Sequence, residues 1–308
     1  MHIGWRVVFS SRETLKRKRR GSRAGQQSLV IAAPRALLQS IFSVLFPSDC
    51  KLCSSPLLNI SRLPVCPECL DAIRPLRAPQ CVICGDRLHS AQLLRGDGQC
   101  ANCRESAPDF ERAVSFGEYQ DELRGLIHLL KYERVTPARG PLGRMLAEAI
   151  SDLLPGCGQE KFLLVPVPLH RNRRRARGFN QAELLARAAL KRLPRELEFA
   201  TGVLIRKRET ISQVGLSREE RIENMRGAFR VIDADRVRGR SVIVVDDVMT
   251  TGTTVSECAR VLKKAGAEKV WAATVARAFH GAEVANSEDT EVEEEAEAGV
   301  SDPVLVSS

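Results

Sequence analysis

The sequence is poor in features that several protein classes depend on. Aromatic residues make up only 5% of the chain, with two Trp and two Tyr, so few side chains are available to stack on exposed bases. The uncharged stretch at 36–47 is shorter than the roughly 20 apolar residues that a membrane-spanning helix needs. Pro34 and Arg35 interrupt the apolar stretch that follows the basic start, so the pattern does not indicate a cleavable secretion signal. We therefore expect a cytoplasmic protein without a transmembrane segment.

Charge is distributed unevenly along the chain. The net charge is +9, but residues 281–308 carry nine acidic residues and no basic one, so the remainder sums to +18. We interpret residues 281–308 as a disordered acidic tail. Residues 1–33 are predicted to be a disordered basic extension, with five consecutive basic residues at 16–20. This extension is either a solvated tail or a segment that attracts nucleic acid or anionic lipid.

The cysteines are concentrated in one part of the chain. Eight of the ten form four C-x-x-C pairs, namely Cys50 and Cys53, Cys66 and Cys69, Cys81 and Cys84, and Cys100 and Cys103. Each pair bends the chain so that two thiolates reach one tetrahedral Zn²⁺, and a second pair completes the site. We assign consecutive pairs to one ion, although an interleaved arrangement is also compatible with the spacing. Four thiolates leave no open position, so two structural zinc ions are expected in a double zinc ribbon over 50–110.

One stretch points to chemistry more specifically than any other. Residues 242–245 are β-branched, as is typical of a buried strand in a parallel sheet. Asp246 and Asp247 follow at the carboxyl end, where open α/β sheets bind ligands. Apolar residues at helical spacing over 255–262 predict a helix, and a helix start favours phosphate. The candidate phosphate-binding residues before it are Met249, Thr250, Thr251, Gly252, Thr253 and Thr254.

The lysine of a Walker loop is absent from this stretch, which excludes a nucleoside triphosphatase loop. Carboxylates do not bind phosphate, so Asp246 and Asp247 are expected to bind sugar hydroxyls or Mg²⁺. Phosphate, sugar and metal at the end of one strand fit phosphoribosyl pyrophosphate. The alternative is a strand-to-helix turn without a ligand.

Two other segments are candidates for contact with an anionic ligand. A predicted strand at 162–168 ends in prolines and leads into an arginine-rich loop that contains Arg171, Arg173, Arg174, Arg175 and Arg177. These arginines are either solvated or, because five guanidinium groups repel one another, placed to receive an anion such as pyrophosphate. The polar segment 206–229 is typical of a mobile lid, the alternative being an ordinary surface loop. Its candidate residues are Thr210, Gln213, Arg221 and Asn224.

The motifs together resemble the ComF family. The hallmarks are Val165-Pro166-Val167-Pro168-Leu169-His170, Arg177-Gly178-Phe179-Asn180-Gln181, the series from Thr210 to Phe229, and Val244-Val245-Asp246-Asp247 with Thr250-Thr251-Gly252. The resemblance covers about residues 36–280. It implies an α/β fold of the type I phosphoribosyltransferase class over 111–280, with a mostly parallel sheet flanked by helices. The double zinc ribbon would precede this domain, and 34–49 would form an amphipathic helix.

The resemblance also implies roles for individual residues. Asp246 and Asp247 would be catalytic residues that contact the ribose hydroxyls directly or through Mg²⁺. Residues 250–254 would cradle the 5-phosphate, the arginine loop would face pyrophosphate, and residues 206–222 would close over it.

Members of the family are associated with natural competence, where they handle incoming single-stranded DNA with a helicase partner. Others resemble a protein linked to gluconate uptake. Three functions therefore stay open for this chain. The first is a phosphoribosyltransferase that acts on an unidentified base, and the second is a nucleic-acid-binding module. The third is a regulator that binds phosphoribosyl pyrophosphate without turnover.

Overall fold

The computed structural model describes most of the chain between the two charged ends. The described residues are 48–57, 61–154, 161–210 and 217–279. The predicted basic extension, acidic tail and almost all of the predicted helix at 34–49 lie outside these residues, as does Gln213. None of the helices in this described part combines the length and the apolar character that a bilayer crossing requires.

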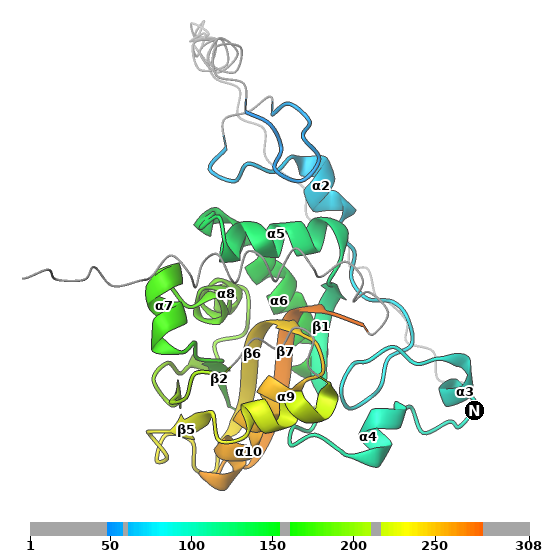
Figure 1. The fold of residues 1–308 in the computed structure, drawn as a ribbon, viewed down its shortest axis with the longest axis vertical. Coiled ribbons are helices and arrows are strands. Elements are labelled where there is room, and N and C mark those ends of the chain that lie inside the picture. Colours follow the sequence, from blue (N-terminus) through cyan, green and yellow to red (C-terminus); the bar gives the residue numbers. More distant parts are fainter. Residues whose placement is uncertain (1–47, 58–60, 155–160, 211–216, 280–308) are drawn as a thin grey trace, which may run out of the picture.

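A parallel five-stranded sheet forms the centre of the fold (Figure 1). In spatial order its strands are β1 (Ala113–Glu118), β7 (Lys269–Arg277), β6 (Ser241–Met249), β2 (Phe162–Pro166) and β3 (Leu197–Phe199). Each strand pairs in parallel with its neighbours. The predicted α/β fold with a mostly parallel sheet is therefore confirmed.

Helices cover both faces of this sheet. On one face lie α5 (Asp121–Lys131), α6 (Arg139–Leu153) and α8 (Gln181–Leu190), with the short η1 (Thr136–Ala138) between α5 and α6. On the other face lie α10 (Thr253–Lys264) and α9 (Arg218–Met225). A short antiparallel pair, β4 (Leu204–Arg206) and β5 (Phe229–Val231), joins the α10 face. The sheet is therefore buried on both sides, which explains its continuous apolar runs.

The central strand β6 is longer than the sequence predicts. Its first residues, Val242–Val245, are fully buried between β2 and β7, as β-branched residues of a central parallel strand should be. Pairing with β7 continues through Asp246 and reaches Met249, which lies opposite Arg277. Both aspartates therefore lie within the last part of the strand, rather than just after its end as predicted.

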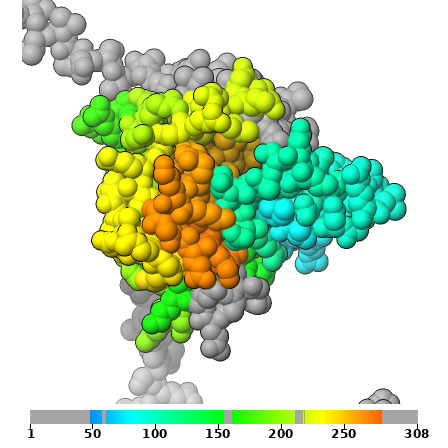
Figure 2. Space-filling view, turned by 90° about the horizontal axis from the view of Figure 1, so that it is seen from below, coloured from blue at the N-terminus to red at the C-terminus, as the bar shows by residue number. Residues whose placement is uncertain are grey.

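The cysteine-rich region packs against this domain in two places. Its first part contains α2 (Pro67–Ala72) and contacts α5, while its second part contains α3 (Ser90–Leu93) and α4 (Ala101–Glu105) and lies on the β1 side (Figure 1). The backbone N–H of Ala113 at the start of β1 donates to the carbonyl of Ile83 at 2.7 Å. Figure 2 shows the second part, in teal, directly beside the orange segment near the end of the described chain.

The two parts contribute to opposite cores. Cys50, Cys66 and Cys69 pack with the helices α5, α6 and α8, whereas Cys81, Cys84, Cys100 and Cys103 belong to the cluster that contains α10. The region is therefore integrated with the sheet on both faces.

Candidate functional site

The two aspartates at the end of β6 form the centre of the candidate site. Asp247 is buried, with 5% of its surface exposed, and Asp246 is partly buried. Asp246 Oδ1 accepts a hydrogen bond from the N–H of Asp247 at 2.9 Å, and Asp247 Oδ1 accepts one from the N–H of Val248 at 2.8 Å. These backbone bonds hold both carboxylates at the carboxyl edge of the sheet, as the position of the pair predicted.

Lys131, the last residue of α5, pairs with one of these carboxylates. Its Nζ lies 3.1 Å from the buried Asp247 Oδ2 and forms an ion pair with it. Burial, the largest single effect, would lower the pKa of Lys131, but the charge of Asp247 together with those of Tyr119 and Tyr132 raises it. Lys131 is therefore a cation of the site that the sequence alone did not identify.

Asp246 has no such ion pair with any residue that the structure describes. Burial, followed by the negative charge of Asp247, raises the pKa of Asp246 from 3.8 to about 8. One lysine thus balances the charge of two adjacent carboxylates, and a further cation would favour ionisation of Asp246. Carboxylate oxygens are ligands that Mg²⁺ prefers, and the adjacent carboxylates of Asp246 and Asp247 supply such oxygens at one place. The residues therefore fit Mg²⁺.

The predicted phosphate-binding turn connects β6 with α10. Gly252 is the N-cap residue of α10 and has a left-handed φ of 79°, which glycine adopts without steric cost. The hydroxyl oxygens of Thr251 and Thr253 lie 2.8 Å apart. As at any helix start, the N–H groups of the first turn point out of α10 and favour an anion. The side chain of Met249 is buried, so only its backbone belongs to this turn.

The arginine-rich segment is a helix, not the loop that we predicted. It forms α7 (Arg171–Arg177), whose last turn is closed by a hydrogen bond from the N–H of Gly178 to the carbonyl of Arg174 at 2.9 Å. Gly178 has a left-handed φ of 80°, typical of a helix C-cap. Arginine is a good helix former, so the segment that follows the proline-ended strand forms a helix.

Contacts place α7 close to the aspartates. The Arg177 guanidinium lies over the ring of Tyr132, next to Lys131, with 5.3 Å between the guanidinium carbon and the ring centroid. At its other end, the side-chain amide of Asn172 donates to Glu209 at 2.7 Å. Burial, and then the positive charge of Arg173, lower the pKa of Arg206, while the charge of Asp246 opposes this shift. Arg206 is therefore close enough to Arg173 of α7 and to Asp246 to be affected by both charges, which the sequence did not reveal.

The predicted lid contains regular structure. Thr210 is buried and accepts a hydrogen bond from Arg206, and Arg221 is buried within α9. The backbone carbonyl of Asn224 accepts a hydrogen bond from Arg208 at 2.6 Å. A capping box between Ser217 and Glu220 starts α9, which contacts α10. Closure of this segment over a ligand stays a prediction.

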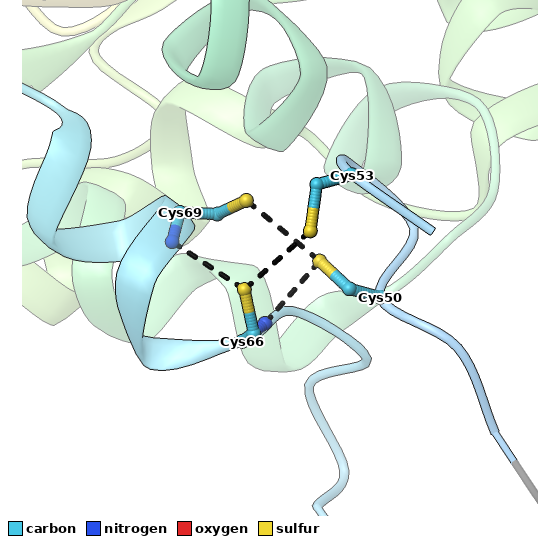
Figure 3. Close-up of side chains that lie close together, drawn as sticks. All are labelled: Cys50, Cys53, Cys66 and Cys69. Atoms are coloured by element: carbon cyan, nitrogen blue, oxygen red, sulfur yellow. Dashed lines mark hydrogen bonds between the residues drawn. The ribbon is translucent and has the colours of Figure 1, made fainter. Parts of the chain in front are cut away.

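The eight paired cysteines form two compact groups. Within each consecutive quartet, Cys50 to Cys69 and Cys81 to Cys103, all four sulfur atoms lie within 4.8 Å of one another. In the first quartet, Cys50 Sγ lies 3.9 Å from Cys69 Sγ, and Cys53 Sγ lies 3.7 Å from Cys66 Sγ (Figure 3). This grouping is the consecutive one that we assigned, and such sulfur tetrads fit Zn²⁺.

Comparisons with known proteins agree with this architecture. A model of the phosphoribosyl transferase domain matches residues 180–306, which cover α8, β6 and the turn into α10. The fold and the match together define a protein with a phosphoribosyltransferase domain of type I.

Relatives along most of the chain specify the family. The chain is 32% identical to Competence protein F of Haemophilus influenzae over 225 residues, covering 72% of this chain and 93% of that protein. It is 33% identical to DNA utilization protein YhgH of Escherichia coli K12 over 227 residues, covering 73% and 94%. Competence protein ComFC of Bacillus subtilis is 26% identical over 207 residues, covering 66% and 79%. The chain belongs to the ComF family, as its motifs predicted.

The two cysteine quartets generate a prediction about metal content. We expect about two zinc ions per chain by elemental analysis. Replacing both Cys81 and Cys84 with serine should remove one ion and leave the other, because the quartets are separate. Cys258→Ala is the matched control, since Cys258 is buried in the core outside both quartets, and it should retain both ions. One ion or none in the unmodified protein would contradict the assignment.

The raised pKa of Asp246 generates a prediction about pH. The folded protein holds this proton up to about pH 8, whereas the unfolded chain releases it near 3.8, so folding stability should fall as pH rises between these values. In the absence of Mg²⁺, the melting temperature of Asp246→Asn minus that of the unmodified protein should therefore increase as the pH rises from 5 to 8. Asp235→Asn is the control, because Asp235 is exposed, and its melting temperature should differ from that of the unmodified protein by the same amount at each pH. If the melting temperatures of Asp246→Asn and the unmodified protein change with pH in parallel, the raised pKa of Asp246 is refuted.

Proposed function

We propose that this protein binds phosphoribosyl pyrophosphate with Mg²⁺ at the carboxyl edge of its sheet and acts in the cytoplasm in the use of incoming DNA. The observation that carries the proposal is the charge of the edge. Asp246 and Asp247 share one lysine beside a helix start, so the site favours a further cation and a phosphate within the same ligand.

Each part of this ligand has matching residues. Asp246 and Asp247 would contact the ribose hydroxyls or hold Mg²⁺, which supplies positive charge to the pyrophosphate. The N–H and hydroxyl groups of residues 250–254 would bind the 5-phosphate at the start of α10. Arg173 and Arg177 of α7, together with Arg206, would face the pyrophosphate. Lys131 would keep Asp247 ionised while the ligand is bound.

The same arrangement supports transfer of the phosphoribosyl group. Displacement of pyrophosphate from C1 of the ribose builds negative charge on the leaving group, and the guanidinium groups near α7 would stabilise that charge. Closure of the segment around α9 would exclude water that otherwise hydrolyses the donor. A nitrogen base would then form the new bond to C1. Pyrophosphate release with a panel of bases separates an active transferase from a regulator that only binds the donor.

The link to DNA rests on the relatives and on the surface of α7. Relatives that align with most of this chain are named for competence and DNA utilization. Arg171, Arg174 and Arg175 of α7 are exposed, so they would bind the phosphates of single-stranded DNA. With few aromatic residues for stacking, this binding would be mainly electrostatic. A helicase that supplies or receives the strand would be the protein partner.

Donor binding is expected to raise the melting temperature in the presence of Mg²⁺, because a ligand that binds only the folded state stabilises it. Asp246→Ala combined with Asp247→Ala should abolish this shift. Asp233→Ala combined with Asp235→Ala is the matched control, since it removes two exposed carboxylates from a distant turn and should leave the shift intact. An undiminished shift in the Asp246 and Asp247 double variant would rule out the site.

Binding of single-stranded DNA is expected to weaken steeply as salt increases, since it releases counterions from phosphate. Replacement of Arg171, Arg174 and Arg175 by alanine should lower the affinity and flatten the salt dependence. Replacement of Lys191, Arg192 and Arg195 by alanine removes the same charge from the end of α8 and should have little effect. Salt-independent binding, or equal loss in both triple variants, would argue against α7 as the contact surface.

A further inference from the structure

A cleft separates the second cysteine quartet from the phosphate-binding turn. It has a volume of about 200 Å³, and its walls include Cys84 and Cys103 of the quartet and Thr251 to Thr253 of the turn. Helix α9 contributes Ile222, which is 39% exposed. Figure 2 shows the surface where the teal segment that contains α4 meets the orange and yellow segments. The cleft thus lies next to the position proposed for the phosphorylated sugar, and none of the arginines of α7 lines it.

Arg277 is the distinctive residue of this cleft. It ends β7 opposite Met249, and only 3% of its surface is exposed. Its Nε and Nη1 are buried and donate no hydrogen bond to the described part of the chain. Its Nη2 lies 3.8 Å from Asp86 Oδ1, beyond hydrogen-bonding distance. A buried guanidinium with unused donors is costly, and such a group indicates a partner that binds there.

The other charged side chains of the cleft have partners of their own. Glu257 accepts two hydrogen bonds from Arg260, both at 2.7 Å, and a third from the N–H of Gly227 at 2.8 Å. Arg226 pairs with Glu223 at 3.3 Å at the exposed rim. Arg277 is therefore the buried cation of the cleft, and its Nε and Nη1 have no acceptor among the described residues.

The remaining walls define what kind of ligand fits. Phe110 and Ile222 provide apolar surface, and the cleft is smaller than pockets for drug-sized molecules. The donor phosphate would occupy the start of α10, so a second anionic group is needed for Arg277. A carboxylate matches a guanidinium through two parallel hydrogen bonds.

From these observations we infer that the cleft binds a small heterocyclic carboxylate through Arg277, as the acceptor beside the phosphorylated sugar. The acceptor role rests on the proposed function, whereas binding of the carboxylate does not. Asp86 would weaken this binding, because its negative charge lies close to the same guanidinium.

The test measures affinity by calorimetry on the full-length, zinc-loaded protein. The probes are heterocyclic carboxylates, each compared with its neutral carboxamide, including nicotinate with nicotinamide. Each is titrated with and without phosphoribosyl pyrophosphate and Mg²⁺. We expect at least one carboxylate to bind about tenfold or more tightly than its carboxamide, as a charge-assisted hydrogen bond would give.

Variants test whether the preference for carboxylate over carboxamide arises in the cleft. Arg277→Gln should abolish it, and Arg277→Lys should keep part of it. Asp86→Asn should tighten carboxylate binding, and Ile222→Glu, which adds negative charge at an exposed position, should weaken it. Arg238→Gln, an exposed arginine outside the cleft, is the matched control and should change nothing.

Three results would overturn the inference. The first is the absence of any carboxylate preference in the unmodified protein, and the second is an unchanged preference in Arg277→Gln. The third is loss of one zinc ion in Arg277→Gln while Asp86→Asn and Ile222→Glu leave carboxylate affinity unchanged. That result would make Arg277 a counter-cation for the thiolates. If Arg277→Gln does not fold, Asp86→Asn and Ile222→Glu decide alone, and unchanged affinity in both overturns the inference.

The outcome is separable from the proposed function. The melting-temperature shift caused by the donor depends on Asp246 and Asp247, so Arg277→Gln should retain it. Absence of that shift in the unmodified protein would reject donor binding, while the contrast between carboxylate and carboxamide would still test the cleft.

Discussion

Two carboxylates held side by side at the end of a buried strand impose the main physical constraint on this protein. Like charges placed close together repel more strongly where burial removes the screening of water. Lys131 relieves this repulsion for Asp247, whereas burial and then the charge of Asp247 raise the pKa of Asp246 to about 8. The two carboxylates at the edge of the sheet therefore favour binding of one more cation, which a metal-bound ligand would supply.

The surrounding structure keeps that pair in place. Strand β6 is paired on both sides, and helices cover both of its faces, so the aspartates cannot move apart without breaking the sheet. The two cysteine quartets join the opposite cores, one beneath α5 and one beside α10. Helix α5 carries Lys131, and α10 begins at the phosphate-binding turn. Zinc in these quartets would therefore support the two helices that supply the charge and the helix start of the site.

Local sequence patterns were sufficient to predict the centre of the fold. The β-branched run before Asp246, the hydroxyl-rich turn at Gly252 and the apolar spacing of α10 are all short-range signals, and each element lies where its pattern indicated. The spacing within each cysteine pair likewise brings two thiolates together, and the grouping of quartets agrees with the assignment.

The residues that the sequence missed depend on long-range packing. Lys131 reaches Asp247 only because α5 crosses the edge of the sheet, and Arg277 is unusual only because β7 buries it next to a distant cysteine quartet. The loop predicted for the arginine-rich segment was wrong for a different reason. The prediction relied on the prolines that end the preceding strand and left out the helix propensity of arginine and the capping geometry of Gly178.

The most direct test of the central claim is a crystal structure of the protein with phosphoribosyl pyrophosphate and Mg²⁺. Our account predicts the 5-phosphate at the start of α10, the ribose hydroxyls or the metal at Asp246 and Asp247, and the pyrophosphate facing α7. A ligand bound elsewhere, or a phosphate-binding turn without phosphate at saturating concentration, would contradict it.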